Sequence, residues 1–78
     1  MIGKILKNMR LTAKLSQKEL GNKLNMADTT VSSYERENSQ PDFNTIVKIA
    51  EICDFKILFK DKENNIISLE SMSEEKDF

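Results

Sequence analysis

Hydroxyl side chains are concentrated in one stretch of the chain, residues 28 to 36. Hydroxyl groups donate and accept hydrogen bonds, so such a surface can recognise a polar partner through several weak contacts. Serine and threonine are mediocre helix formers, and a helix face selected only for solubility would rather carry glutamate and lysine. The composition therefore favours a binding surface. Its polar residues are Asp28, Thr29, Thr30, Ser32, Ser33 and Arg36.

Catalysis has no residues to support it. The chain has no histidine and a single cysteine, so it lacks the nucleophile and base pairs of hydrolases, and it has no glycine-rich phosphate loop. Cys53 alone cannot form an internal disulfide, and a zinc site is not expected. We interpret Cys53 as a small buried apolar residue rather than a reactive thiol. The sequence predicts a non-enzymatic protein without cofactors.

A short helix is predicted directly before the hydroxyl-rich stretch. Ser16 followed by Glu19 is the pattern of a capping box, so the helix begins at Gln17. Gly21 lies beside the apolar face of this helix and costs about 1 kcal/mol relative to alanine, which indicates a close contact with a neighbouring helix. Asn25 tolerates a positive φ and ends the helix.

The hydroxyl-rich stretch itself is predicted to be a second helix. Val31 and Tyr34 are three residues apart and mark its buried side, which leaves the polar residues on the other side. Two short helices joined by a tight turn form a helix-turn-helix, the motif that places its second helix in a DNA major groove.

The sequence resembles the lambda-repressor/Cro-like helix-turn-helix family, also called the XRE family, over residues 2–55. The resemblance implies a mainly α fold of four to five helices and a DNA-binding transcriptional regulator. It also implies a partly buried ion pair between Arg10 and Glu35. The residues that carry the resemblance are Gln17, Leu20, Gly21, Leu24, Asn25, Met26, Val31, Tyr34, Glu35 and Pro41.

The resemblance also implies which residues face DNA. The family positions that match Gln17, Asp28, Thr29 and Ser33 supply most contacts to bases or near them. Lys18 belongs to a helix N-terminus that would lie against a phosphate. The residues expected to contact DNA are Gln17, Lys18, Asp28, Thr29, Thr30, Ser32, Ser33, Arg36, Asn38 and Ser39.

Two features depart from the usual family pattern or are awkward for it, the loop that begins at Glu37 and the acid at Asp28. Glu37 stands where the family usually has glycine, and Asn38 and Ser39 follow in place of basic residues, so the usual phosphate contacts are weakened. Asp28 can either stabilise its helix start as a capping acid or accept a hydrogen bond from cytosine. We favour the capping role because Ala27, at the usual capping position, cannot cap.

The net charge of −1 is unevenly distributed. Residues 1–36 carry seven basic and three acidic groups, whereas residues 37–78 carry five basic and ten acidic groups, so the halves have net charges of +4 and −5. The first half is therefore a plausible phosphate-facing surface.

Two further helices complete the expected helical domain, residues 1–54. The first helix runs from about residue 2 to Ala13. The other follows the loop at Pro41, has Asp42 as its N-cap and runs from Phe43 to about Cys53. Their predicted apolar stripes are Ile2, Ile5, Leu6 and Met9 in the first, and Phe43, Ile46, Val47, Ile49, Ala50 and Cys53 in the other.

A β-hairpin is predicted over residues 55–70, in place of the last helix of the family. Residues 55–60 and 66–69 are rich in β-branched and aromatic side chains, and the five residues between them are turn formers. An isolated hairpin is marginal in water, so we expect it to pack on the helices or to pair with a second copy as a dimerisation element. Residues 71–78 are predicted to be a flexible acidic tail.

Three functions remain open. The first is a homodimeric repressor that binds a pseudo-palindromic double-stranded DNA operator, and the second is an antitoxin that also binds a toxin through its hairpin and tail. The third is a protein-binding module without DNA affinity. No apolar run approaches the ~20 residues of a membrane span, and the chain start lacks a signal-peptide pattern, so no membrane partner and a cytoplasmic location are expected.

Overall fold

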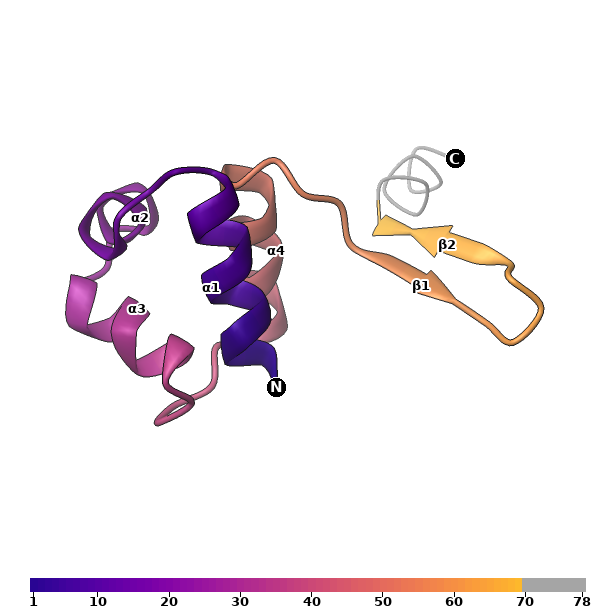
Figure 1. Cartoon of the computed structure of the whole chain (residues 1–78), viewed down its shortest axis with the longest axis horizontal. Helices are drawn as coiled ribbons and strands as arrows, with labels where there is room; N and C mark the ends of the chain where they lie inside the picture. Colours follow the sequence, from indigo (N-terminus) through magenta and orange to yellow (C-terminus); the bar gives the residue numbers. More distant parts are fainter. Residues whose placement is uncertain (70–78) are drawn as a thin grey trace.

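Four helices and a two-stranded hairpin make up the fold in the computed structural model (Figure 1), which describes residues 1–69. The mainly helical prediction with a C-terminal hairpin is confirmed, and the predicted tail at 71–78 lies outside the described residues. The elements are α1 (Ile2–Thr12), α2 (Gln17–Leu24), α3 (Asp28–Glu35), α4 (Phe43–Ile52), β1 (Leu58–Lys60) and β2 (Ile66–Ser68).

The core is built from side chains of all four helices and lies between them. Its buried apolar residues are Leu6, Met9, Leu20, Val31, Ile49, Ala50 and Cys53. The predicted burial of Ile5 and Phe43 in apolar stripes is wrong, because these residues are 48% and 50% exposed. Ile5 lies about 100° around α1 from Leu6, outside the covered stripe, and Phe43 occupies the first position of α4.

All four helices end on a residue in the left-handed conformation, and none of these residues is glycine. They are Lys14, Asn25, Glu37 and Asp54, with φ of 61°, 57°, 63° and 67°. In each case the next N–H donates to the carbonyl five residues back, which closes a Schellman-type end. The pairs are Leu15 with Arg10, Met26 with Gly21, Asn38 with Ser33, and Phe55 with Ala50.

Both glycines permit a close approach of backbones. A Cβ at Gly21 would lie 2.7 Å from the Met26 carbonyl oxygen, so the close contact predicted at this position exists, but it is made with the turn after α2 and not with a neighbouring helix. A Cβ at Gly3 would lie 2.5 Å from the Glu35 carbonyl oxygen, a contact that the sequence did not reveal. Gly3 thus allows α1 to lie tightly against the end of α3, and Gly21 allows α2 to lie tightly against the turn that follows it.

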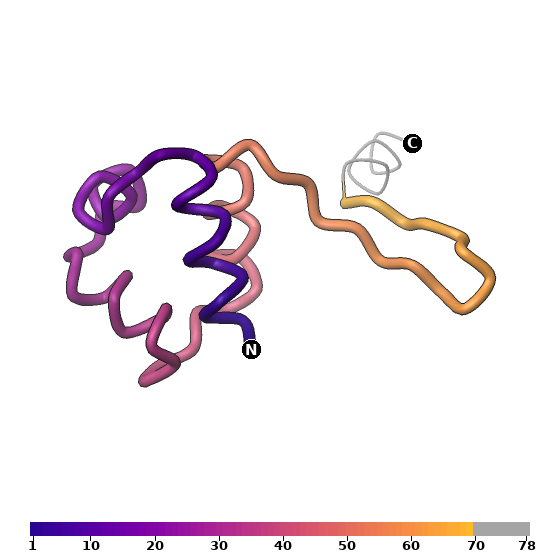
Figure 2. The backbone as a smooth tube through the Cα atoms, viewed as in Figure 1, coloured from indigo at the N-terminus to yellow at the C-terminus, as the bar shows by residue number. Residues whose placement is uncertain are grey.

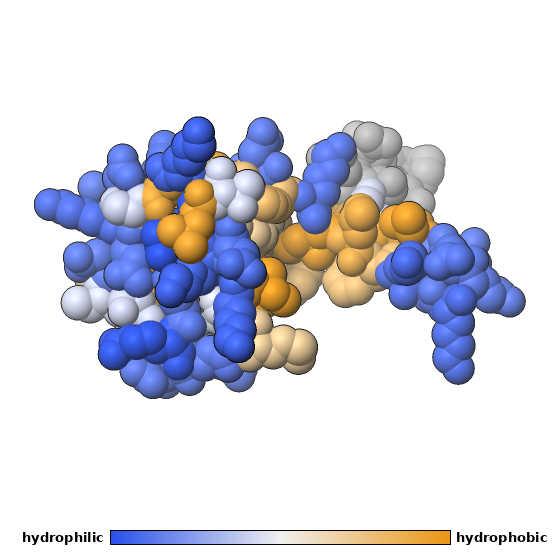
Figure 3. Space-filling model, viewed as in Figure 1, coloured by the Kyte–Doolittle hydropathy of each residue, from blue (hydrophilic) through white to orange (hydrophobic). Residues whose placement is uncertain are grey.

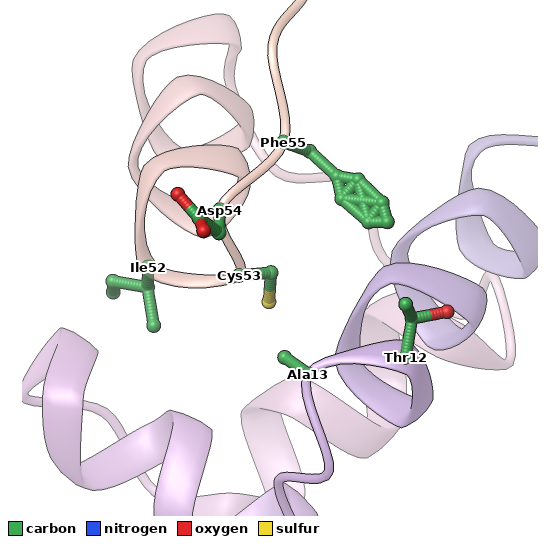
Figure 4. A pocket seen from close by; sticks show the side chains of 6 residues that line it. All are labelled: Thr12, Ala13, Ile52, Cys53, Asp54 and Phe55. Atoms are coloured by element: carbon green, nitrogen blue, oxygen red, sulfur yellow. The ribbon is translucent and has the colours of Figure 1, made fainter.

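The Cys53 thiol is buried where the chain leaves the helical body. It lies beside a shallow pocket between the C-terminal ends of α1 and α4 (Figure 4), and only 4% of the residue is exposed. Cys53 belongs to the buried core cluster, so its interpretation as a buried apolar residue is confirmed, and this burial raises the pKa of the thiol. The lining residues are Thr12, Ala13, Ile52, Cys53, Asp54 and Phe55.

The hairpin projects away from the helices (Figure 2). Its strands are antiparallel, with Phe59 opposite Ile67, and five residues connect them as predicted. The strands are shorter than predicted, because the Phe55 N–H still closes α4 and the chain straightens only after it. Asp61 organises the loop: its carboxylate accepts bonds from the N–H of Glu63 and of Asn65, at 2.8 and 2.9 Å.

Candidate nucleic-acid interface

Helix α3 keeps its apolar side inward and leaves its polar side exposed or half-buried. Val31 is 2% exposed, and Tyr34 packs against the same core. The two helices that hold α3 in this orientation are α1 and α2. On the polar side Asp28, Thr29 and Arg36 are exposed, whereas Thr30, Ser32 and Ser33 are half-buried.

A buried ion pair fixes the end of α3 to α1. Arg10 Nε donates to Glu35 Oε2 at 2.6 Å and Arg10 Nη2 to Glu35 Oε1 at 3.0 Å, a bidentate pair whose side chains are 8% and 4% exposed. Arg10 Nη1 also donates to the Leu15 carbonyl at 2.9 Å, so the same guanidinium reaches the connection to α2. The predicted ion pair is confirmed.

The electrostatics of this pair favour both charged forms. Burial acts to raise the pKa of Glu35, but the hydrogen bonds from Arg10 and Gln17 outweigh it and leave that pKa below its usual value. The hydrogen bond to Glu35 raises the pKa of Arg10, against the effect of burial. The pair therefore stays ionised, and its net charge is zero.

Gln17 is more constrained than a free surface residue. Its Nε2 donates to Glu35 Oε1 at 3.1 Å, so its amide is held on the ion pair. Gln17 is nevertheless half-exposed at the first position of α2, next to the exposed Lys18. The structure thus joins the start of α2 to the end of α3 through one amide, a connection that the sequence did not predict.

The N-terminus of α2 is capped as predicted. Ser16 Oγ accepts the Glu19 N–H at 3.0 Å, and Glu19 Oε1 accepts the Ser16 N–H at 2.8 Å. The N–H groups of Gln17 and Lys18 occupy the first two positions of the helix, where the helix dipole favours an anion.

Asp28 does not cap α3. The N-cap is Ala27, which makes no side-chain bond, and Asp28 occupies the first helical position. The interpretation of Asp28 as the capping residue is therefore wrong, because the helix begins at Asp28 itself and not after it. Asp28 still lies in the first turn, where a negative charge is favourable. Its carboxylate is exposed at the start of the polar face.

Glu37 has a role that the sequence did not reveal. Glu37 adopts the left-handed φ expected of the family's glycine. Its Oε2 accepts a hydrogen bond from the Gly3 N–H at 3.1 Å and forms an ion pair with the Met1 amino group. The Met1 amino group and the Gly3 N–H lower the pKa of Glu37. Glu37 therefore satisfies the start of α1, and no local sequence pattern signals a contact over 34 residues.

The two polar residues after Glu37 extend the surface of α3. Asn38 and Ser39 are exposed, and both N–H groups donate to the Ser33 carbonyl, at 2.9 and 3.5 Å. Ser33 Oγ and Ser39 Oγ lie 2.9 Å apart and share a hydrogen bond. The structure therefore brings Ser33, Asn38 and Ser39 together at one end of the predicted surface.

Positive charge dominates the exposed surface of residues 1–36. The buried Arg10 and Glu35 cancel, and the remaining acids of this segment are the exposed Glu19 and Asp28. The surface thus carries six cations against two carboxylates, a balance suited to a polyanion. The exposed cations are Lys4, Lys7, Lys14, Lys18, Lys23 and Arg36.

Comparison with known proteins agrees with this geometry. A family model described as helix-turn-helix matches residues 6–59. The chain belongs to the helix-turn-helix family. This membership confirms the resemblance to the XRE type that the sequence suggested, and the matched range contains α2, α3, the ion pair and most of α1.

A curated relative shares part of the helix-turn-helix chain. The chain is 39% identical over 51 residues to the HTH-type transcriptional regulator ImmR of Bacillus subtilis (strain 168), an alignment that covers 65% of the chain. The chain spans 40% of the length of that relative. No solved structure matches the chain. Among residues 1–69, no helix is long and apolar enough to cross a membrane.

Proposed function

We propose that this helix-turn-helix protein is a sequence-specific DNA-binding transcriptional regulator, acting as a repressor, that inserts α3 into the major groove. The observation that carries the proposal is the polar side of α3, which is exposed at its start and half-buried further along, on a helix whose end is fixed to α1 by the Arg10–Glu35 pair. A recognition helix must present its side chains without reorganising, because ordering them on binding would cost affinity.

Contacts to bases belong to the first half of α3 and to Ser33. Thr29 offers a hydroxyl group to base edges and a methyl group to thymine, and Asp28 can accept a hydrogen bond from a cytosine amino group. Thr30 and Ser32 are half-buried and would support these contacts at the edge of the groove.

Contacts to phosphates surround α3. Lys18 and the first N–H groups of α2 would receive one phosphate, and Gln17 would lie beside it with its amide held by Glu35. At the other end of α3, Arg36 supplies a charged contact, and Asn38 and Ser39 supply neutral donors. With few charged contacts the affinity of one copy would be modest, so two copies on a pseudo-palindromic operator are part of the proposal.

Fluorescence anisotropy on duplexes selected from a random pool tests the proposal. Arg36→Ala should weaken binding to all sequences and reduce the slope of log affinity against log salt by about 1, because one phosphate contact is lost. Thr29→Ala should cost about tenfold on the selected sequence and less on others. Lys48→Ala, at an exposed position of α4, is the matched control for charge. Absence of any salt-dependent binding would refute the proposal.

An antitoxin function is the second candidate. It would use α3 in the same way and add a toxin as partner, and the exposed apolar hairpin is the feature that favours a protein partner. Co-purification of a second chain, encoded next to this one, would support the antitoxin function over the repressor.

A further inference from the structure

Glu37 is an acid in a loop that the proposed function places against DNA. Asn38 and Ser39 follow it directly, and both are exposed at the end of α3. Figure 3 shows hydrophilic side chains over the region where α3 and this loop lie in Figure 1. A carboxylate that points at a phosphate is repelled by it, so the direction of the Glu37 side chain decides whether the loop can face DNA.

The carboxylate of Glu37 points at α1. Its Oε2 accepts the N–H of Gly3 at 3.1 Å, although the two residues are 34 positions apart in the chain. Gly3 is the second residue of α1, where an N–H has no acceptor within its own helix. A Cβ at Gly3 would lie 2.6 Å from Glu37 Cγ, so the lack of a side chain at Gly3 makes room for Glu37.

The charge of Glu37 is balanced at the start of α1. The Met1 amino group forms an ion pair with the carboxylate and, together with the Gly3 N–H and Lys4, lowers the pKa of Glu37. A carboxylate with cations around it repels a phosphate less than a free one. The loop can therefore present Asn38 and Ser39 to DNA in spite of the acid beside them.

The backbone of the same loop is tied to α3. The N–H of Glu37 donates to the Tyr34 carbonyl at 3.1 Å, and the N–H of Asn38 donates to the Ser33 carbonyl at 2.9 Å. Glu37 has a φ of 63° in this turn, a conformation that glycine adopts at no steric cost. Glycine would therefore fit the backbone better, but it could not reach α1. With Glu37, the loop is anchored to α3 by its backbone and to α1 by a side chain.

We propose that Glu37 is a positioning residue for DNA binding. Its hydrogen bond with the Gly3 N–H, which we call the Glu37 clamp, holds residues 37–39 against α1 and fixes the positions from which Asn38 and Ser39 donate to phosphates. The proposal rests on the proposed function, because the loop must face DNA for its position to matter. Replacing Glu37 by the glycine that is usual in the family should change DNA affinity and leave the fold intact.

Fluorescence anisotropy with a selected duplex tests the proposal through the direction of two changes. Glu37→Gly and Glu37→Gln both remove a negative charge, which by itself strengthens binding to a polyanion. Glu37→Gly also removes the clamp and should weaken binding at least about threefold, because the loop must then be ordered on binding. Glu37→Gln keeps an oxygen acceptor for the Gly3 N–H and should bind at least as tightly as the wild type.

Asp54→Gly is the matched control. It makes the same change of acid to glycine in the left-handed conformation, beside the other end of α1 and about 16 Å along that helix from the clamp. Because exposed charges at such a distance are screened, its DNA affinity should differ less than about twofold from the wild type. Thermal unfolding should show that Glu37→Gly melts no more than about 4 °C below the wild type.

Amide hydrogen exchange without DNA separates the clamp from the proposed function. The Gly3 amide should exchange at least about tenfold faster in Glu37→Gly and change less than about threefold in Glu37→Gln. Unchanged exchange in Glu37→Gly, or tighter DNA binding by this variant, overturns the proposal. Equal weakening of DNA binding by both Glu37 variants also overturns it, because the effect would belong to the charge and not to the hydrogen bond. A clamp seen by exchange in a chain that binds no duplex would refute the proposed function alone.

Discussion

At the scale of single residues, Arg10 and Glu35 decide how rigidly the recognition helix is held. Both side chains are nearly inaccessible, and together with Gln17 and the Leu15 carbonyl they connect α1, the start of α2 and the end of α3. A buried pair of this kind contributes little net stability, but it strongly penalises the loss of one partner. In this chain the pair serves to fix the orientation of α3 relative to α1 and α2.

Arg10→Met should lower the free energy of unfolding by about 3–5 kcal/mol, because Glu35 is left buried without its partner. The double variant Arg10→Met/Glu35→Leu should recover most of this loss, since no buried charge remains. Urea denaturation followed by circular dichroism measures both values. Equal stability of the single variant and the wild type would show that the pair is not buried in solution.

The same pair predicts a pH dependence. The pKa of Glu35 is lowered in the folded chain, so its contribution to stability is fully present above its unfolded pKa, about 4.5, and is lost as the pH falls through the lower folded pKa. Stability of the wild type should therefore fall below about pH 4.5. Glu35→Gln should be less stable at pH 6, and its difference from the wild type should shrink toward pH 3. A difference that is constant with pH would contradict this.

At the scale of elements, the helix ends explain how a chain with two glycines makes four tight turns. The left-handed positions are filled by lysine, asparagine, glutamate and aspartate, which carry a steric cost that glycine would avoid. Sequence patterns identified Asn25, because asparagine tolerates this conformation. Lys14, Glu37 and Asp54 gave no such signal, and only the surrounding hydrogen bonds impose their φ.

Asp54→Gly should therefore stabilise the chain by about 0.5–1 kcal/mol, because the strain at φ 67° is relieved without loss of a core contact. Glu51→Gly, one turn earlier and inside α4, is the control and should destabilise by about 1 kcal/mol. Thermal unfolding of both variants gives the comparison. Destabilisation by both would show that the turn after α4 does not hold the left-handed conformation.

At the scale of the whole molecule, local rules predicted much of the fold. Capping residues located α2 and α4, Gly21 indicated a close contact but not its partner, and the spacing of turn residues fixed the five-residue loop of the hairpin. The ion pair followed from the family resemblance and not from any local pattern. The residues predicted to contact DNA are exposed or half-buried in the structure, and their contacts to DNA stay predictions.

Some of the misses depend on contacts between distant parts of the chain, and others depend on where a helix begins. The exposure of Ile5 and Phe43 depends on which neighbours cover each helix, and the contact of Glu37 with Gly3 joins two helix ends. Asp28 failed as a cap because the helix begins one residue earlier than its side chain would require. The register that separates the two faces of the hairpin also appears only once the strands are paired.

The central claim is that α3 enters the DNA major groove. A titration of the isotope-labelled chain with a selected duplex, monitored through amide NMR chemical shifts, tests it most directly. The account predicts the largest changes at residues 17–18 and 28–39, with the loop of the hairpin at 61–65 unchanged. Changes confined to the hairpin, or no changes with any duplex at low salt, would contradict a role of α3 in the major groove.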